Sequence, residues 1–487
     1  MVKRLSIRGL IIPAHLLLVC GLVWLGTLSP WSWQAHVWFY SLSALTVVVG
    51  VWAVWSWARV SRSLFDPYIL FLVAAMLFNG GYALLQVLNL NADGIMGGDF
   101  SDRTVAQSLY AVVLGTAALH LGALLGVWNG TAGTNGPDVA PPDGPAREDQ
   151  ACRLVGYFLF AIAIVPTLLL LQQAIAVVMS SGYFGLYLRQ QATSFAALPR
   201  VLAAFLMPSA IFLLAGSRHH RSGRVLSALM VLGFAGIQFF LGSRMNAAMP
   251  LIAYAWLWHR RIRRLPAPLL LAGGAVMLFV VFPLISFTRI TPGSQRMSLF
   301  TMWDTLTSTR SPVVTIVSDM GNTLRTVAYT LDLVPAVRPY DGGEGYLYGL
   351  LTVFPNLFWP VHPTIARGLA ADWLVRTVAP EYAAVGKGFG YSFLAEAYLN
   401  FGWLGLLLVP AVVGFLLVRF FLWAQQRDHS GRLAAVASFT SLFLVFARSE
   451  SGNMWRNLTW YALLPYLLVL FVCAYRGGRA AEQSSHK

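Results

Sequence analysis

Three arginines stand at the ends of apolar segments, where a charged side chain is costly. An isolated arginine close to hydrocarbon is usually retained for a specific contact. Its guanidinium group is planar, permanently charged and complementary to phosphate oxygens. Snorkelling or an ion pair explains any one of them equally well, whereas several on one surface predict a phosphate or diphosphate site. The three are Arg244 in GSRMNA, Arg289 in SFTRIT and Arg448 in FARSESGN.

Three further arginines, Arg325, Arg367 and Arg376, lie in the long stretch 287–401 between two groups of apolar segments. They are second candidates for the same phosphate chemistry. The stretch contains eight basic and eight acidic residues, so it is neutral as a whole. The prediction therefore depends on the local arrangement of guanidinium groups and not on a long-range field.

A carboxylate in the same stretch is the favoured proton acceptor. Transfer of a group onto a hydroxyl needs an Asp, Glu or His that takes the hydroxyl proton. Glu396, in GKGFGYSFLAEAYLNFG, is the first candidate, and a structural pair with an arginine is its alternative. His362, in FWPVHPT, is a second candidate base, although a histidine near prolines is more often a turn residue. Glu450 is interpreted as a group that orients Arg448, and the sequence leaves open which group is the base.

Aromatic side chains near these polar residues are suited to carbohydrate binding, because sugar rings can stack on the faces of tyrosine and tryptophan. Interfacial aromatic belts of membrane proteins explain the same residues nearly as well. The candidates are Tyr183, Tyr187, Trp359, Trp373 and Tyr391.

Motifs of several other chemistries are absent from the sequence. It contains no GxxxxGK[ST], no HExxH, no DxD and no cluster of His and Cys. ATP hydrolysis, zinc hydrolysis and ordinary metal-assisted transfer from a nucleotide sugar therefore lack their usual residues. We expect no metal, no cofactor and no nucleic-acid partner.

The composition places these residues in a membrane protein. Of 487 residues, 57% are hydrophobic and only 11% are charged, against about 25% charged in a soluble protein. This excludes a secreted domain, a disordered scaffold and a soluble enzyme with one anchor. The net charge is +15, and only three of the 34 basic residues are lysine. Cys20, Cys152 and Cys473 are too far apart to indicate a disulfide framework or a zinc site.

Hydropathy predicts an all-α polytopic membrane protein with about 12 transmembrane helices. A span needs about 20 mostly apolar residues. When the N-terminus is placed inside, the arginine-rich loops also fall inside, which predicts an N-in and C-in topology. The polar stretch 129–153 is expected to be a flexible inner linker. The predicted spans are 9–28, 37–58, 67–89, 104–127, 154–180, 197–216, 225–241, 246–258, 265–286, 402–423, 433–448 and 458–475.

The predicted domain organisation follows from these spans. Residues 1–286 hold transmembrane helices 1–9, 287–401 form a large outer loop, and 402–487 hold helices 10–12 and an inner tail. Within the loop, amphipathic patterns predict helices between Pro312 and Pro335 and over 364–378. A helix over 388–423 is too long for one crossing, so a break is expected near Gly402 or Gly405.

Three stretches of the sequence resemble the O-antigen or oligosaccharide repeat-unit polymerases of the Wzy type, which are related in architecture to O-antigen ligases. The resemblance covers mainly 225–460, while the first half agrees only in hydropathy. The stretches are FFLGSRMNAAMPLIAY at 239–254, DMGNTL at 319–324 and GFGYSFLAEAYLNFGWLGLLLVPAVVGF at 388–415.

This resemblance implies a glycosyltransferase of the GT-C-like kind in the bacterial inner membrane, with its active site facing the periplasm. It implies transfer of a growing glycan from undecaprenyl diphosphate to another lipid-linked repeat unit during synthesis of a surface polysaccharide such as lipopolysaccharide. By this likeness Arg244, Arg289 and Arg448 bind the donor diphosphate without a metal. Glu396 is the base or a site organiser. Membrane lipid and a chain-length regulator are the further candidate partners.

Three other functions remain open from the sequence. An O-antigen ligase, which transfers the lipid-linked glycan to lipid A core, would use the same donor. A lipid-glycan transporter or flippase would favour charged residues near mid-membrane and repeats of broken helices. An acyltransferase or a non-catalytic assembly protein is the third. The sugars, the linkage, the kind of polysaccharide and the oligomeric state are not encoded in any motif of the sequence.

Overall fold

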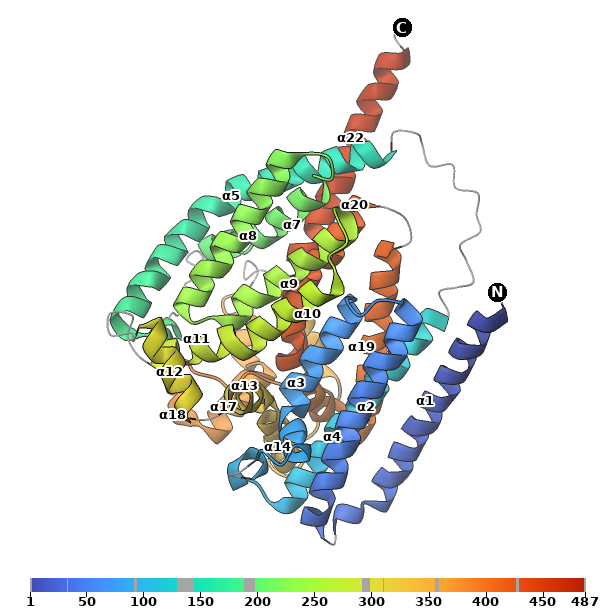
Figure 1. The fold of residues 1–487 in the computed structure, drawn as a ribbon, viewed down its shortest axis with the longest axis vertical. Coiled ribbons are helices and arrows are strands. Elements are labelled where there is room, and N and C mark those ends of the chain that lie inside the picture. Colours follow the sequence, from blue (N-terminus) through green and yellow to red (C-terminus); the bar gives the residue numbers. More distant parts are fainter. Residues whose placement is uncertain are drawn as a thin grey trace. The chain divides into compact units, whose positions relative to one another are not determined.

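The computed structural model describes residues 2–32, 34–91, 94–128, 144–187, 198–290, 298–309, 311–354, 359–425 and 429–485. Within these ranges every regular element is a helix and none is a strand (Figure 1). Helices suit a lipid solvent because each backbone polar group is paired inside its own segment. The predicted all-α polytopic fold is confirmed.

Eleven helices among the described residues are long and apolar enough to cross a membrane. They match eleven of the twelve predicted spans. The twelfth, 246–258, is helical too and belongs to α9 (Arg244–Arg261), whose 18 residues include three arginines. The eleven are Gly9–Ser32, Ala35–Ser61, Pro67–Val87, Asp102–Trp128, Ala146–Ser181, Leu198–Ala215, Arg221–Leu241, Ala267–Ser286, Phe393–Gln425, Ser430–Arg448 and Ser451–Arg476.

The chain forms two compact units that are interleaved along the sequence. Unit 1 comprises Met1–Asn135, Val313–Leu422 and Leu444–Met454. Unit 2 comprises Gly136–Pro312, Trp423–Phe443 and Trp455–Lys487. The division predicted above, at 286 and 401, separates spans from loop and stays a prediction.

Unit 1 is built on four N-terminal helices, drawn in blue and cyan in Figure 1. α2 packs on α3 and α4, and α1 packs on α4. α14 packs on α3, α4 and α17, so this bundle supports the segments that follow the long loop. The helices are α1 (Val2–Leu28), α2 (Trp38–Ser61), α3 (Pro67–Val87), α4 (Asp102–Trp128), α13 (Pro312–Gly321), α14 (Thr323–Leu333), α15 (Glu344–Leu351), α16 (Pro363–Arg367), α17 (Ala370–Val378), α18 (Pro380–Ala384), α19 (Phe393–Gln425) and α21 (Ser451–Asn457).

Two buried histidines link the first four helices. Trp52 Nε1 donates to His15 Nδ1 at 3.1 Å, so His15 Nε2 carries the proton and donates to a carbonyl oxygen of α4 at 2.8 Å. His120 Nε2 lies 2.7 Å from Ser56 Oγ, and its Nδ1 lies 3.3 Å from the Tyr68 hydroxyl. The two imidazole rings meet edge to face, with centroids 4.8 Å apart. Since an unpaired polar group in hydrocarbon is costly, these bonds favour one arrangement of the four helices.

α19 crosses α4 at glycines. A Cβ atom at Gly122 of α4 would overlap the carbonyl oxygen of Ala411, and one at Gly414 of α19 would overlap that of Leu119. Small residues at a crossing let two helix backbones approach closely. The crossing therefore fixes α19, which carries Glu396, against the N-terminal bundle.

α19 is interrupted near its N-terminal end. Phe401 (φ −139°, ψ 16°) and Gly402 (φ 61°, ψ −145°) depart from helical geometry. Glycine adopts such a conformation readily, whereas a side chain would be strained there. The predicted break is confirmed at Gly402, and it separates the turns that carry Glu396 from the long apolar remainder of the helix.

Unit 2 contains a second group of packed helices. α5 packs on α6, α7 and α22, and α20 packs on α7 and α9. Residues 144–153 were predicted as linker and are wrong in that respect, because they form the first turns of α5; residues 129–143 lie outside the described residues. The helices are α5 (Gly144–Ser181), α6 (Leu198–Ala203), α7 (Leu206–Ala215), α8 (Arg221–Leu241), α9, α10 (Ala267–Val276), α11 (Phe282–Ile290), α12 (Leu299–Thr309), α20 (Ser430–Phe443) and α22 (Leu464–Ser485).

Two predicted loop helices are each divided in the structure. The one between Pro312 and Pro335 is α13 and α14, and the chain turns at Asn322, whose Oδ1 accepts from the Tyr82 hydroxyl at 2.8 Å. The one over 364–378 is α16 and α17. Gly368, with φ 77°, ends α16 because this left-handed backbone cannot continue a right-handed helix.

Candidate functional site

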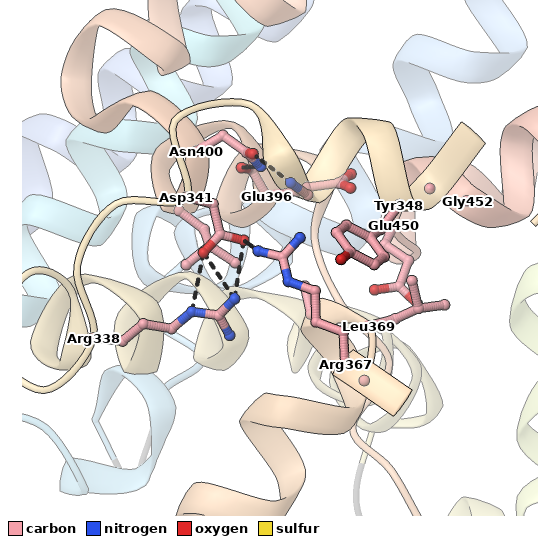
Figure 2. Close-up of a pocket in the computed structure, with 14 residues that line it drawn as sticks. Arg338, Asp341, Tyr348, Arg367, Leu369, Glu396, Asn400, Glu450 and Gly452 are labelled. Carbon is pink, nitrogen blue, oxygen red and sulfur yellow. Dashed lines mark hydrogen bonds and ion pairs between the residues drawn. The ribbon is translucent and has the colours of Figure 1, made fainter. Parts of the chain in front are cut away.

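A small pocket in unit 1 is lined by charged side chains from four separate segments (Figure 2). The segments lie before and within α15, at the end of α16, in the first turns of α19 and before α21. The lining residues are Arg338, Asp341, Gly345, Tyr348, Gly349, Arg367, Gly368, Leu369, Ala370, Glu396, Leu399, Asn400, Glu450 and Gly452.

Asp341 holds the two arginines of the pocket together, as Figure 2 shows. Arg338 Nη2 donates to both carboxylate oxygens at 2.7 and 2.9 Å, and Nε donates to one of them at 3.1 Å. Arg367 Nη2 lies 3.1 Å from Asp341 Oδ2 and 3.3 Å from Glu344 Oε2. Such charge-assisted bonds are strong and directional, so they fix the orientation of both guanidinium groups.

Each of these guanidinium groups also faces an aromatic ring. Arg338 Cζ lies 4.6 Å from the ring centroid of Trp373, and Arg367 Cζ lies 4.4 Å from that of Tyr348. Cation–π contacts of this kind add to the attraction of the carboxylates. The sequence analysis missed Arg338 and Asp341. Their i, i+3 spacing was a signal, but such pairs are common on protein surfaces.

Glu396 is buried in the first turn of α19, with 3% of its surface exposed. Both of its oxygens bind one residue: Ser451 N donates to Oε2 at 2.7 Å, and Ser451 Oγ donates to Oε1 at 2.6 Å. Burial, with a further contribution from the Glu396 charge, raises the pKa of Tyr346 well above its usual value, so this phenol stays protonated. The geometry suits Glu396 to organising the site, and its role as a base stays a prediction.

The 447–452 segment, which includes Ser451, is held by further bonds. Asn79 Nδ2 donates to its first carbonyl at 3.0 Å, Tyr391 N donates to the carbonyl of Arg448 at 3.3 Å, and Thr352 Oγ1 donates to its last carbonyl at 2.7 Å. Glu450 Oε2 accepts the backbone N–H of Ala371, at the start of α17, at 3.1 Å. This segment therefore presents the Glu450 carboxylate at a fixed place in the pocket.

His362 caps the N-terminus of α16. Its Nδ1 accepts the backbone N–H of Thr364 at 3.2 Å, so its Nε2 carries the proton and donates to the carbonyl of Phe354 at 3.2 Å. Only 5% of the residue is exposed, and it does not line the pocket just described. The structure thus gives His362 the turn role that its neighbouring prolines indicated, and its role as a base stays a prediction.

Arg448 and Arg325 hold backbone segments of unit 1. Arg448 Nη2 donates to the carbonyl of Phe389 at 3.3 Å. Arg325 Nη1 lies 2.6 Å from Asp99 Oδ2, and its Nη2 donates to the carbonyl of Met96 at 2.7 Å. These contacts are structural, and the predicted contacts of both arginines with phosphate stay predictions.

Arg244 and Arg289 are brought to one turn of unit 2. Gly242, with φ 91°, ends α8, and α9 begins two residues later at Arg244. Arg289 Nε donates to the carbonyl of Gly242 at 2.9 Å, and its Cζ lies 4.5 Å from the ring centroid of Tyr183. Two arginines that are 45 positions apart in sequence therefore meet near the N-terminus of an 18-residue helix.

Comparison with known proteins adds one match. The family model of the O-antigen polysaccharide polymerase Wzy matches residues 11–477, nearly the whole chain. No curated protein matches the chain. No solved structure matches it either. Because the family model includes both units and all the residues discussed above, the chain belongs to the O-antigen polysaccharide polymerase Wzy family.

Proposed function

We propose that this protein polymerises undecaprenyl-diphosphate-linked oligosaccharide repeat units into a bacterial surface polysaccharide, by metal-independent glycosyl transfer at the periplasmic face of the inner membrane. Membership of the polymerase family supports the reaction class. The orientation is supported by the arginine-rich loops at 218–224 and 259–264, which the positive-inside rule places in the cytoplasm. The carrier is inferred from chemistry, because an outward-facing site has no supply of nucleotide sugars.

The meeting of Arg244 and Arg289 at the Gly242 turn carries this proposal. The first turn of α9 has backbone N–H groups without helical partners and the positive end of the helix dipole. Two guanidinium groups beside it add permanent charge and N–H donors that match phosphate oxygens. This combination of groups is suited to a diphosphate.

The same groups explain how transfer proceeds without a divalent cation. As the bond between the anomeric carbon and the diphosphate oxygen breaks, the electron pair stays with the diphosphate. The negative charge that develops there is stabilised by Arg244, Arg289 and the N-terminus of α9, which are already in place. The incoming hydroxyl oxygen forms the new glycosidic bond and gives up its proton.

A reconstituted assay tests the proposal. Purified protein receives a synthetic polyprenyl-diphosphate repeat unit in the presence of EDTA, and product length is followed by mass spectrometry. We expect a ladder of lengths for the wild type and a decrease of about 100-fold or more in rate for Arg289→Ala, since electrostatic contacts to a leaving group contribute on this scale. Arg289→Lys should recover only part of the rate, because an ammonium group cannot form paired bonds to phosphate.

Arg221→Ala is the matched control. Arg221 is exposed at the opposite end of α8 from Gly242, about 30 Å away along the helix, and its loss should leave the ladder intact. A ladder that requires added Mg²⁺ contradicts the metal-independent proposal. Transfer of one intact glycan to lipid A core, without a ladder, would instead indicate a ligase, and movement of the lipid without new bonds would indicate a transporter.

A further inference from the structure

The pocket of unit 1 has the wrong charge for a diphosphate. Its lining contains two guanidinium groups, from Arg338 and Arg367, and three carboxyl groups, from Asp341, Glu396 and Glu450. With every group ionised, the lining carries one net negative charge. An occupant with several negative charges is therefore disfavoured, whereas a neutral ligand that both donates and accepts hydrogen bonds is favoured.

The arginines of the pocket are already neutralised. Asp341 binds both, and 7% of its side chain is exposed, so the three groups form a partly buried cluster. Glu344 adds a second carboxylate beside Arg367. What the guanidinium groups can still offer is directional N–H donation, which suits the oxygen of a hydroxyl group as well as that of a phosphate.

The remaining polar groups of the pocket complement hydroxyl groups. Asn400 is fixed there, because its Nδ2 donates to the carbonyl of Glu396 at 2.8 Å and its Oδ1 accepts the N–H of Gly345 at 3.2 Å. Tyr348 contributes an aromatic ring to the lining. Carboxylates that accept, guanidinium groups that donate and an aromatic ring together match the hydroxyl groups and apolar face of a sugar.

The two glutamates of the pocket have different duties. Glu396 uses both oxygens on Ser451, the residue that follows Glu450. Glu450 receives one backbone N–H from the start of α17 and belongs to a segment that is held on both sides. Glu396 therefore acts as a positioning residue for Glu450.

We propose that this pocket binds the terminal sugar of the acceptor glycan and that Glu450 is its catalytic base. This rests on the proposed function above. In the step, the acceptor hydroxyl oxygen bonds to the anomeric carbon of the donor as the bond from that carbon to the diphosphate breaks. The hydroxyl proton passes to a Glu450 carboxylate oxygen, and the electron pair of the broken bond leaves with the diphosphate. Glu450 then returns the proton to water.

Binding and turnover measured separately test the two parts of the proposal. The binding probe is the methyl glycoside of the repeat unit, prepared from the polysaccharide of the source cell, which carries no diphosphate. We expect Asp341→Asn to weaken binding of this probe at least 10-fold and to leave binding of undecaprenyl diphosphate unchanged. Arg289→Ala should show the reverse. If Asp341→Asn weakens only undecaprenyl diphosphate, the pocket is a donor site and the proposal is overturned.

Glu450→Gln tests the base. We expect a loss of rate of about 100-fold or more, the scale of general-base catalysis, with binding of the methyl glycoside within 3-fold of wild type. Formate added to Glu450→Ala should restore part of the rate, which a merely structural role would not allow. Glu381→Gln, an exposed glutamate in the first turn of α18, is the control and should behave as wild type.

The outcomes separate this proposal from the one on which it rests. A wild-type ladder together with a Glu450→Gln ladder of equal rate overturns the assignment of the base and leaves the polymerase proposal standing. Loss of rate in Glu450→Ala without rescue by formate, when the variant also fails to bind the methyl glycoside, assigns Glu450 to structure. Absence of a wild-type ladder rejects the polymerase proposal itself.

Discussion

Glu396 and Ser451 are joined by two hydrogen bonds although 55 positions separate them in the sequence. Each bond to a buried carboxylate contributes about 1.5–3 kcal/mol. We expect Glu396→Ala to lower the free energy of unfolding by about 2–5 kcal/mol, because it leaves two donors of Ser451 unpaired. Ser451→Ala, which removes one bond, should cost about half as much. Thermal unfolding in detergent measures both.

Glu396→Gln separates position from proton transfer. The amide keeps the shape and one acceptor, so a positioning residue should lose stability and part of its activity together. Hydrogen exchange of the 447–452 segment should then rise in parallel with the loss of rate. A variant that keeps wild-type protection of this segment yet loses about 100-fold in rate would make Glu396 the base.

Gly402→Ala tests the break in α19. The backbone at this residue (φ 61°, ψ −145°) lies in a region that only glycine adopts without strain, and Tyr340 lies 3.2 Å from where a Cβ would be placed. We expect a loss of about 1–3 kcal/mol, read as a lower unfolding temperature. Gly233→Ala is the control: Gly233 lies in α8 with open space around it, so alanine should be neutral or slightly stabilising. Equal effects of the two changes would contradict the argument.

His120→Leu tests the polar network of the N-terminal bundle. The substitution leaves the Ser56 and Tyr68 hydroxyls without their imidazole partner, at a cost of about 1–3 kcal/mol for each group that stays unpaired. We expect lower thermal stability and unchanged activity per folded molecule. Activity measured against the folded fraction checks this, and a large loss of specific activity in fully folded protein would point to a role beyond packing.

Tyr346→Phe is expected to act in the opposite direction. Among the described residues the buried Tyr346 hydroxyl has no hydrogen-bond partner, and it lies near the Glu396 charge. Removing the hydroxyl should raise stability by up to about 1 kcal/mol, because a buried unpaired donor is costly. Thermal unfolding with and without the methyl glycoside reports the result. A variant that is less stable only with the glycoside would show that the hydroxyl binds sugar.

The sequence by itself determined the solvent, the fold class and most of the helices. Runs of about 20 apolar residues are long-range averages that no tertiary contact can override, because the bilayer penalises every alternative to a helix. The break at Gly402 was predictable for the same reason, since α19 at 33 residues exceeds one crossing. The chemistry of Arg244, Arg289 and Glu396 as single residues was also readable from their types and surroundings.

Only the tertiary structure decided which of these residues meet. The Gly242 turn unites Arg244 with Arg289, and Asp341 gathers Arg338 and Arg367. Sequence periodicity carries no information about such contacts, because they depend on how separate helices pack. The same packing gave both oxygens of Glu396 to Ser451 and placed Glu450 in the pocket, since a buried carboxylate binds whatever donors the fold brings to it.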